Sequence, residues 1–430
     1  MYPRYEQYQD SGVAWLGEVP SHWEVKRLKF AIHYISDKTE AQFSDLRYFG
    51  LENIQSFTGK LLDEIELTSE GITHLFQKND VLFGKLRPYL AKVYLAEQNG
   101  LVSTEALVFR SKENIQPKFL FYYCLSPEFI DAVNGTTFGS KMPRASWDDI
   151  GNFKIILPPL PEQTAIAAFL DCKLAQIDAL ISKQETLLAK LAEKRTALIT
   201  RAVTRGLNPA APLKPSGVAW LGEVPQHWEV IQFKRIVESV KDGTHSTYSR
   251  VSDGYPLLSA KNVFNHGLEI GENESLITES DFQQITSNGF PRKNDLLITC
   301  VGSIGRCCVY EFDKPMAFQR SVAFLRLESK ANPYFYRYFV LSSSYQEQLK
   351  ANIKLSIQGG VYLNTLTSLI VYLPPLAEQT AIADYLDAQT AQIDALSDKI
   401  RQTIARLQEY RRTLITQAVT GKIKVIGEHR

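Results

Sequence analysis

The chain has 430 residues, with 48 lysines and arginines against 47 aspartates and glutamates, so its net charge is +1 at pH 7. This length predicts two or three domains, and the near-neutral charge argues against a protein that holds nucleic acid alone by a strongly basic surface. The polar start has no basic segment followed by an apolar one, and no apolar run would span a bilayer, so we expect a cytoplasmic protein without a membrane segment.

The five cysteines do not have the spacing of a metal site. Cys124 and Cys172 stand alone, and Cys300, Cys307 and Cys308 lie in an apolar, strand-like run. A zinc site takes paired ligands at two places, and neither a CxxC pair nor a histidine pair is present. We interpret the cluster as buried, reduced thiols.

Two long phrases occur twice along the chain. SGVAWLGEVPSHWEV begins at Ser11 and returns as SGVAWLGEVPQHWEV at Ser216, a displacement of 205 positions. LPPLPEQTAIAAFLDCKLAQIDALI begins at Leu157 and returns as LPPLAEQTAIADYLDAQTAQIDALS at Leu373, a displacement of 216. The chain is therefore two copies of one plan, in which the ends are nearly identical and the inserts between them have diverged, the second being 11 residues longer.

The inserts are predicted to be mixed α/β. Short β-rich runs bounded by Gly, Asn, Asp and Pro are DVLFG, AKVYLA and EALVFR in the first copy, and DLLITCVG, RCCVYEF and SVAFLRL in the second. A short helix is expected around KFLFYYCLSPEFIDAV and around YFYRYFVLSSSYQEQL. No long helix alternates regularly with these strands, which argues against a doubly wound sheet.

A long helix is predicted after each LPPL phrase, where proline and then Glu-Gln open a helical pattern without breakers. Apolar residues recur in steps of four and three, as along a coiled-coil seam. Gly206 and Gly421 stand near the ends as helix stops. Each helix would run roughly 60 Å at about 1.5 Å per residue. The seam residues are Leu170, Leu174, Ile177, Ile181, Leu188, Leu191 and Leu198 in the first helix, and Leu386, Ile393, Ile400, Ile404, Leu407 and Leu414 in the second.

The two seams have the same phase, with Arg195 and Arg411 at equivalent positions. This match favours helices that pack on each other over helices that pack only on their own inserts. The predicted fold class is therefore α+β: two mixed α/β domains joined by two long helices in an antiparallel coiled coil, with an internal pseudo-twofold repeat. The predicted divisions are 1–157 for the first domain, 158–206 for the central helix, 207–215 for a Pro-rich linker, 216–373 for the second domain and 374–430 for the C-terminal helix.

Catalytic patterns are scarce. The sequence has neither a GxxxxGK[ST] phosphate loop nor a GxGxxG fingerprint. The nearest feature is a nuclease-like ExK triplet at Glu328, Ser329 and Lys330, whose counterpart in the first copy begins with Arg110 and lacks the acid. A stand-alone nuclease stays open as an alternative, although such triplets are common by chance.

Two variable regions, each ending in LPPL-x-EQ-x-x-I-A-x-x-LD and a long helix, resemble the specificity subunit of type I restriction–modification systems, and SGVAWLGEVP-x-HWEV is similar to that family's opening phrase. The resemblance covers essentially the whole chain. It implies that each variable region is a target recognition domain for one half of a split, asymmetric DNA sequence, and that the paired helices set the spacer.

The resemblance also implies partners. The helices would dock two modification subunits, which bind S-adenosylmethionine and methylate adenine, and restriction subunits that use ATP and Mg²⁺ would join them. The chain itself would bind double-stranded DNA without catalytic residues, metal or cofactor of its own. An interaction scaffold whose inserts bind protein rather than DNA is the other alternative.

Residues that contact DNA are expected on loops where the copies differ. Arg and Lys suit guanine, Asn and Gln suit adenine, and hydroxyl or apolar groups suit other base edges. The loop with Lys141 and Arg144 aligns with a neutral segment ending at Gly360, as readers of different half-sites require. The candidates are Lys85, Arg87, Lys141 and Arg144 in the first insert, and His245, Tyr248, Arg250, Lys261, Arg306, Gln319, Arg320 and Gln358 in the second.

Overall fold

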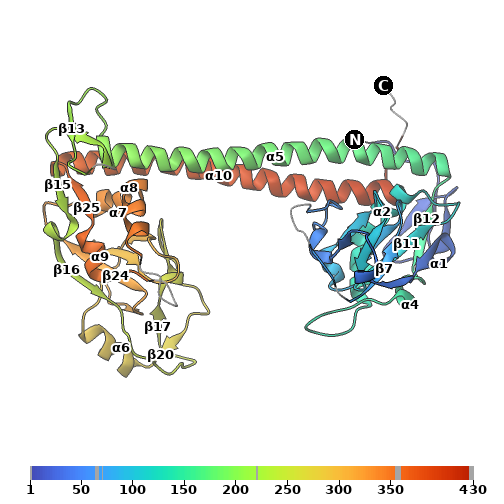
Figure 1. The fold of residues 1–430 in the computed structure, drawn as a ribbon, viewed down its shortest axis with the longest axis horizontal. Coiled ribbons are helices and arrows are strands. Elements are labelled where there is room, and N and C mark those ends of the chain that lie inside the picture. Colours follow the sequence, from blue (N-terminus) through green and yellow to red (C-terminus); the bar gives the residue numbers. More distant parts are fainter. Residues whose placement is uncertain (1, 63–66, 70, 219–220, 354–359, 426–430) are drawn as a thin grey trace. The chain divides into compact units, whose positions relative to one another are not determined.

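The computed structural model describes residues 2–62, 67–69, 71–218, 221–353 and 360–425. The chain forms two compact units: unit 1 is Met1–Gln184 with Arg401–Arg430, and unit 2 is Glu185–Ile400. Two long helices, α5 (Leu160–Arg205) and α10 (Leu376–Val419), therefore each contribute one half to each unit (Figure 1). The units cut across the divisions predicted from the repeats.

Unit 1 is built on two four-stranded sheets, β4-β11-β8-β9 and β5-β7-β10-β6, with the strand pairs β1-β2 and β3-β12 beside them. Its elements are β1 (Tyr8–Asp10), β2 (Glu18–Pro20), β3 (Glu24–Arg27), α1 (Leu28–Ala31), β4 (Ile32–Ile35), β5 (Lys38–Glu40), β6 (Tyr48–Phe49), β7 (Ile72–Phe76), β8 (Val81–Gly84), β9 (Val93–Leu95), β10 (Gly100–Ser103), β11 (Ala106–Ser111), α2 (Pro117–Leu125), α3 (Pro127–Gly135), α4 (Trp147–Ile150) and β12 (Lys154–Leu157).

Unit 2 repeats the first sheet as β16-β24-β21-β22, beside a smaller sheet β20-β17-β23 and the pairs β13-β14, β15-β25 and β18-β19. Its elements are β13 (Leu213–Pro215), β14 (Glu223–Pro225), β15 (Glu229–Gln232), β16 (Val237–Asp242), β17 (Tyr255–Leu258), β18 (Val263–Phe264), β19 (Gly267–Leu268), β20 (Leu276–Ile277), α6 (Glu279–Ser287), β21 (Leu296–Thr299), β22 (Cys307–Val309), β23 (Ala317–Phe318), β24 (Val322–Leu327), α7 (Pro333–Leu341), α8 (Ser343–Ala351), α9 (Leu363–Ser368) and β25 (Ile370–Leu373).

All six β-rich runs named from the sequence are strands, and the internal repeat is confirmed in three dimensions. The copies differ in the smaller sheet. In unit 1, β10 pairs with β6 on one side and with β7 on the other, and β5 lies beyond β7. In unit 2, β23 pairs with β17 in the same parallel register, the turn at Thr244 bridges to Gln319 beyond β23, and α6 packs against both strands. The longer second insert therefore replaces strands with a helix.

The short helix expected in each insert is instead two helices. α2 and α3 meet at Ser126, and α7 and α8 meet at Ser342; both serines have extended backbones, with ψ of 137° and 152°. Each serine hydroxyl donates a hydrogen bond to the carbonyl three residues earlier, at 2.7 and 2.6 Å. A serine that bonds its own backbone in this way competes with the helical ladder, so the chain turns there.

The repeated HWEV and PEQ phrases meet at the start of each long helix. The Trp23 indole nitrogen donates to the Glu162 carboxylate at 3.1 Å, and His22 Nε2 lies 2.7 Å from the same carboxylate. In unit 2, Trp228 and His227 bind Glu378 at 3.0 and 2.8 Å. Both indoles are buried, so each anchors the helix start to its own insert with a satisfied polar group.

The glutamine that follows each of these glutamates is also buried and fully bonded. The Gln163 amide accepts from the Gln116 N–H and donates to the carbonyls of Asn114 and Pro158. Gln379 makes the same three bonds with Asn332, Lys330 and Pro374. The Glu-Gln pair therefore repeats because it fixes the angle between each insert and its helix.

Each long helix ends on the other copy's opening phrase. α5 ends at Gly206, where an added Cβ would lie 2.9 Å from Glu378 and 3.3 Å from Trp228. α10 ends before Gly421, where an added Cβ would lie 2.4 Å from Pro20 and 3.0 Å from Trp23. Both glycines have φ near +70°, which L side chains avoid. The C-terminal helix therefore stops at Val419 and does not extend through the predicted range 374–430.

The two helices pack against each other in antiparallel directions. Arg411 Nε donates to Asp178 at 3.1 Å in unit 1, and Arg195 Nε donates to Asp394 at 3.3 Å in unit 2. These pairs are equivalent in the two copies, since Asp394 and Arg411 lie 216 positions after Asp178 and Arg195. The structure places eight predicted seam residues in buried positions and five in half-buried ones, the latter being Ile181, Leu188, Leu198, Ile404 and Leu407.

The two ion pairs differ in their surroundings. Arg411 is buried and also donates to the carbonyls of Phe57 and Thr58, at 2.7 and 3.2 Å, while Lys60 pairs with Asp178 at 2.7 Å. The first insert is thus attached to the helix pair through a loop. At Arg195 the partner Asp394 is 57% exposed, and the pair is a surface interaction.

We predict that Arg411→Ala lowers the free energy of unfolding of unit 1 by about 3–5 kcal/mol, because two carbonyls and a carboxylate lose their buried partner. Arg195→Ala, the matched control, should cost about 0–1 kcal/mol in unit 2. Native-state hydrogen exchange reports each unit separately. Equal effects of the two substitutions would contradict this difference in burial.

Candidate functional site

The basic loop residues predicted in the first insert lie together. The segment after β8 is joined to the loop before α4 by a β-bridge from Leu86 to Arg144, and Arg144 also bridges to Phe138 within that loop. The Arg87 N–H donates to the Pro143 carbonyl at 2.8 Å, and the Ala145 N–H donates to the Lys85 carbonyl at 3.0 Å. Lys141 lies at the exposed tip of this loop.

Two of these cations are restricted: Arg144 in its side chain and Arg87 in its backbone. Arg144 binds both oxygens of Glu105 at 3.0 Å, which orients its guanidinium and cancels its charge. Arg87 has φ of 50°, a conformation that costs free energy for a non-glycine residue, and its buried Nε has no hydrogen-bond partner. Strain with an unused donor marks Arg87 as the residue here that is most consistent with a binding role.

Four of the residues predicted in the second insert gather around the turn after β16. Thr244 bridges to Gln319, and the Arg320 N–H donates to the Thr244 carbonyl at 3.0 Å. His245 pairs with Asp242 at 2.8 Å, and Thr244 Oγ1 donates to the Tyr248 hydroxyl at 3.2 Å. The turn needs glycine at Gly243, because an added Cβ would lie 2.1 Å from the Phe318 carbonyl oxygen.

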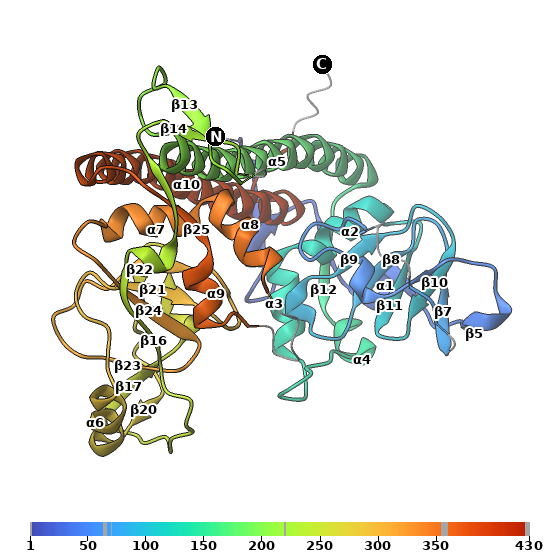
Figure 2. The same cartoon turned by 60° about the vertical axis from the view of Figure 1, so that its left-hand side comes forward.

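This turn and α6 enclose a hollow of about 270 Å³, which we call the α6 hollow. Its walls come from Asp242 to Tyr248 on one side, from α6 and its end on a second, and from β23 and β24 as the floor. Figure 2 shows α6 beside β17, β20 and β23, at the end of unit 2 away from the long helices. Gln284 and Asn288, which line it, were not predicted from the sequence.

The remaining predicted residues lie elsewhere in unit 2. Lys261 pairs with Glu274 at 2.6 Å, and this pairing lowers the pKa of the Glu274 carboxyl. Arg306 stacks over Phe264, 5.1 Å from the ring centre, so the structure holds it beside β18. Arg250 is exposed on the loop before β17, and Gln358 lies outside the described residues.

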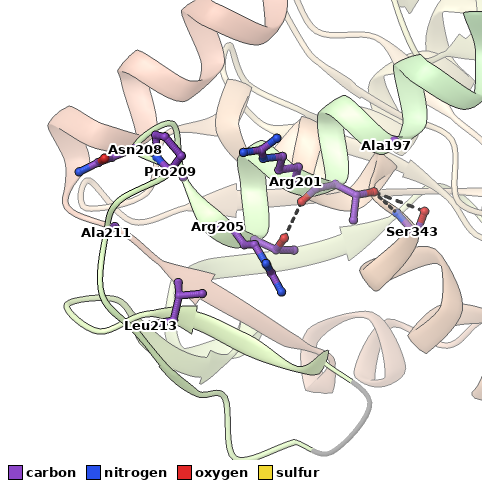
Figure 3. Close-up of a pocket in the computed structure, with 11 residues that line it drawn as sticks. Ala197, Arg201, Arg205, Asn208, Pro209, Ala211, Leu213 and Ser343 are labelled. Carbon is purple, nitrogen blue, oxygen red and sulfur yellow. Dashed lines mark hydrogen bonds between the residues drawn. The ribbon is translucent and has the colours of Figure 1, made fainter.

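A second hollow, of about 570 Å³, lies where α5 passes into the linker (Figure 3). The figure shows Arg201 and Arg205 on the last turns of α5, and Pro209, Ala211 and Leu213 on the linker side. In unit 1 the chain after α10 is bonded to the N-terminal segment: the Lys424 N–H donates to the Pro3 carbonyl, and the Tyr8 hydroxyl donates to the Gly421 carbonyl.

The cysteines and the ExK triplet show no arrangement for catalysis. Cys300, Cys307 and Cys308 are free and buried, and burial raises the pKa of the Cys300 and Cys308 thiols to about 12, which keeps them protonated. Glu328 is paired with Lys330 at 2.8 Å on the surface. Across the part of the chain that the structure describes, His, Cys, Asp and Glu form no group of three suited to a metal ion. Nor does any helix within the described ranges combine the length and apolarity needed to cross a membrane.

These features define a duplicated, two-insert protein whose inserts share a frame and differ in their surface loops. The sequence matches the family described as "Type I restriction modification DNA specificity domain" over residues 20–190 and 225–406. The chain therefore belongs to this family.

Individual relatives agree with this assignment. The chain is 25% identical to the type I restriction enzyme MjaVIII specificity subunit of Methanocaldococcus jannaschii, covering 95% of this chain and 94% of that one. It is 24% identical to the EcoBI specificity subunit of Escherichia coli, covering 80% and 73%.

Solved structures have the same fold. One, described under "complex assembly and conformational transition of the type I R-M system", is 20% identical with a TM-score of 0.72 and covers 93% of this chain and 98% of that one. The HsdS subunit of Thermoanaerobacter tengcongensis is 20% identical with a TM-score of 0.50, covering 94% and 98%.

Proposed function

We propose that this chain is the DNA sequence-specificity subunit of a type I restriction–modification complex, in which each insert reads one half of a split, asymmetric target. The proposal rests on one observation: the same contacts hold the two inserts to their helices, while the surface loops of the two inserts differ. The same Trp–Glu and Gln contacts hold both inserts, whereas the loop at Arg144 is basic and its counterpart at Gly360 is not. Half-sites about one helical turn apart would place both readers on one face of the duplex.

In this proposal the helices set the spacer between the half-sites and dock two modification subunits. Equivalent leucines are exposed on both helices: Leu180 and Leu396 are 47% and 45% exposed, and Leu160 and Leu376 are 45% and 47% exposed. Paired exposed apolar positions suit two identical partners that each bury the same surface.

The proposal assigns catalysis to other chains. Adenine methylation with S-adenosylmethionine would belong to the modification subunits, and ATP- and Mg²⁺-dependent cleavage to restriction subunits. This chain would supply double-stranded DNA binding and assembly in the cytoplasm. The Glu328–Lys330 surface pair gives the nuclease alternative no support, and the family assignment does not favour it.

We predict that deleting this gene abolishes adenine methylation at one split motif on both strands of the genome. Single-molecule sequencing of DNA from the parent and the deletion strain measures this directly, and also identifies the motif. A complementing copy of the gene is the control. If the parent carries a modified split motif that persists after deletion, this chain does not direct it.

We also predict that Leu180→Ser together with Leu396→Ser weakens binding of the modification subunits by at least about 10-fold, because two exposed leucines lose their apolar contact. Titration with the purified modification subunit measures the affinity. Lys190→Ser, an exposed change on the same helix, is the control and should leave it unchanged. Unchanged affinity in the double variant would place the docking surface elsewhere.

A further inference from the structure

The α6 hollow exists because the two inserts differ beside equivalent strands. In unit 1, β7 occupies the free side of β10 with a regular ladder from Gly100 to Ser103. In unit 2, α6 lies against β23, and the space between it and the turn after β16 stays open. The α6 wall of the hollow therefore comes from the segment in which the second insert departs from the first.

α6 is firmly attached to the rest of unit 2. The Thr278 side chain caps its N-terminus by accepting from the Asp281 N–H. Phe282 stacks on Tyr255 with ring centres 4.3 Å apart, and Ile285 is buried against Leu257. A helix fixed by a cap and two packed side chains presents its other face in a defined orientation.

That other face carries unused hydrogen-bonding groups. Gln284 lies in the last turn of α6, and Asn288, four residues on, is its C-cap residue with a still helical backbone (φ −77°, ψ −5°), so the two lie one turn apart on the same side. Both side chains are exposed and line the α6 hollow. Neither amide is hydrogen-bonded within the described residues, and the same is true of the Ser246 hydroxyl across the hollow.

The charges around the hollow also suit a nucleic acid. Lys241 donates to the Asn288 carbonyl at 2.8 Å and, with Arg292, lines the adjoining depression. The acids of α6, Glu279 and Asp281, lie in its first turn, at the opposite end from Asn288. The carboxylate of Asp242 in the wall is paired with His245. Cations beside unpaired amides match a phosphate next to a base edge.

We propose that the α6 hollow is the base-reading site of the second insert, and that Gln284 and Asn288 are specificity-determining residues. A side-chain amide accepts a hydrogen bond from adenine N6 through its oxygen and donates one to adenine N7 through its nitrogen, so adenine is the base these residues select. A short exposed helix of this kind fits the major groove. This inference rests on the proposed function and names the residues and base through which it operates.

The test is selection from duplexes in which both half-sites are randomised, using the complex of this chain with its modification subunits. Variants are Gln284→Ala, Asn288→Ala and their combination. The matched control is Gln283→Ala, which sits next to Gln284 but bonds Glu279. We expect each single variant to lose about 10-fold of the discrimination at one A·T pair of one half-site, with the other half-site unchanged.

A variant that gains a preference for a different base provides a second test, because a misfolded protein would not gain one. Gln284→Glu replaces the amide by a carboxylate, which accepts a hydrogen bond from cytosine N4. The selected base at that position should change from adenine to cytosine. Intact discrimination at the other half-site reports correct folding in the same experiment.

The outcomes separate this inference from the proposed function. If the unaltered complex selects a split sequence but the double variant discriminates as well as Gln283→Ala, the α6 hollow does not read bases. Equal loss at both half-sites also overturns the inference. If the unaltered complex selects no split sequence, the proposed function itself fails.

Discussion

Each compact unit depends on a helix that belongs to the other copy. The core of unit 1 contains Leu414, Ala418 and Val419 from the end of α10, and the core of unit 2 contains Ile199, Ala202 and Val203 from the end of α5. At each junction a left-handed glycine brings the helix end against the tryptophan of the opening phrase. An insert with its own helix alone would leave this apolar surface in water, which costs about 25 cal/mol per Å². Each insert therefore needs the helix of a second copy to complete its core.

Because each insert packs on the helix of the other copy, the residues at the helix ends are constrained in both copies, whereas the surfaces far from the helices are not. The Trp–Glu contact, the buried glutamine and the terminal glycine are needed twice, so their phrases are nearly identical in the two copies. The surfaces away from the helices have no such requirement. There the copies differ most, with a strand at β7 in unit 1 and a helix at α6 in unit 2. Inserts that differ in their surfaces but share the same helix contacts suit the recognition of a DNA sequence whose two halves differ.

The frame was predictable from the sequence, and the reading surfaces were predictable only in part. Steps of three and four predict helices, and β-rich runs bounded by turn residues predict strands, because both patterns are local. The break at Ser126 was missed, since it depends on a side-chain bond to the backbone that an apolar run conceals. Gln284 and Asn288 were missed because polar amides on a helix look like ordinary solvated residues; the 11 extra residues of the second copy were the available signal. Which loops meet, as Arg144 meets Leu86, depends on long-range pairing that single-sequence patterns do not encode.

The central claim is that one duplicated frame carries two independent readers, and replacing one reader by the other tests it most directly. In such a chain, residues 28–153 of the first insert would take the place of the equivalent residues 233–369 of the second, with both long helices unchanged. The methylated sequence of the resulting complex is then determined by single-molecule sequencing. Because the helices are antiparallel, the account predicts two identical half-sites in inverted orientation. A direct repeat, or persistence of the original second half-site, would contradict it.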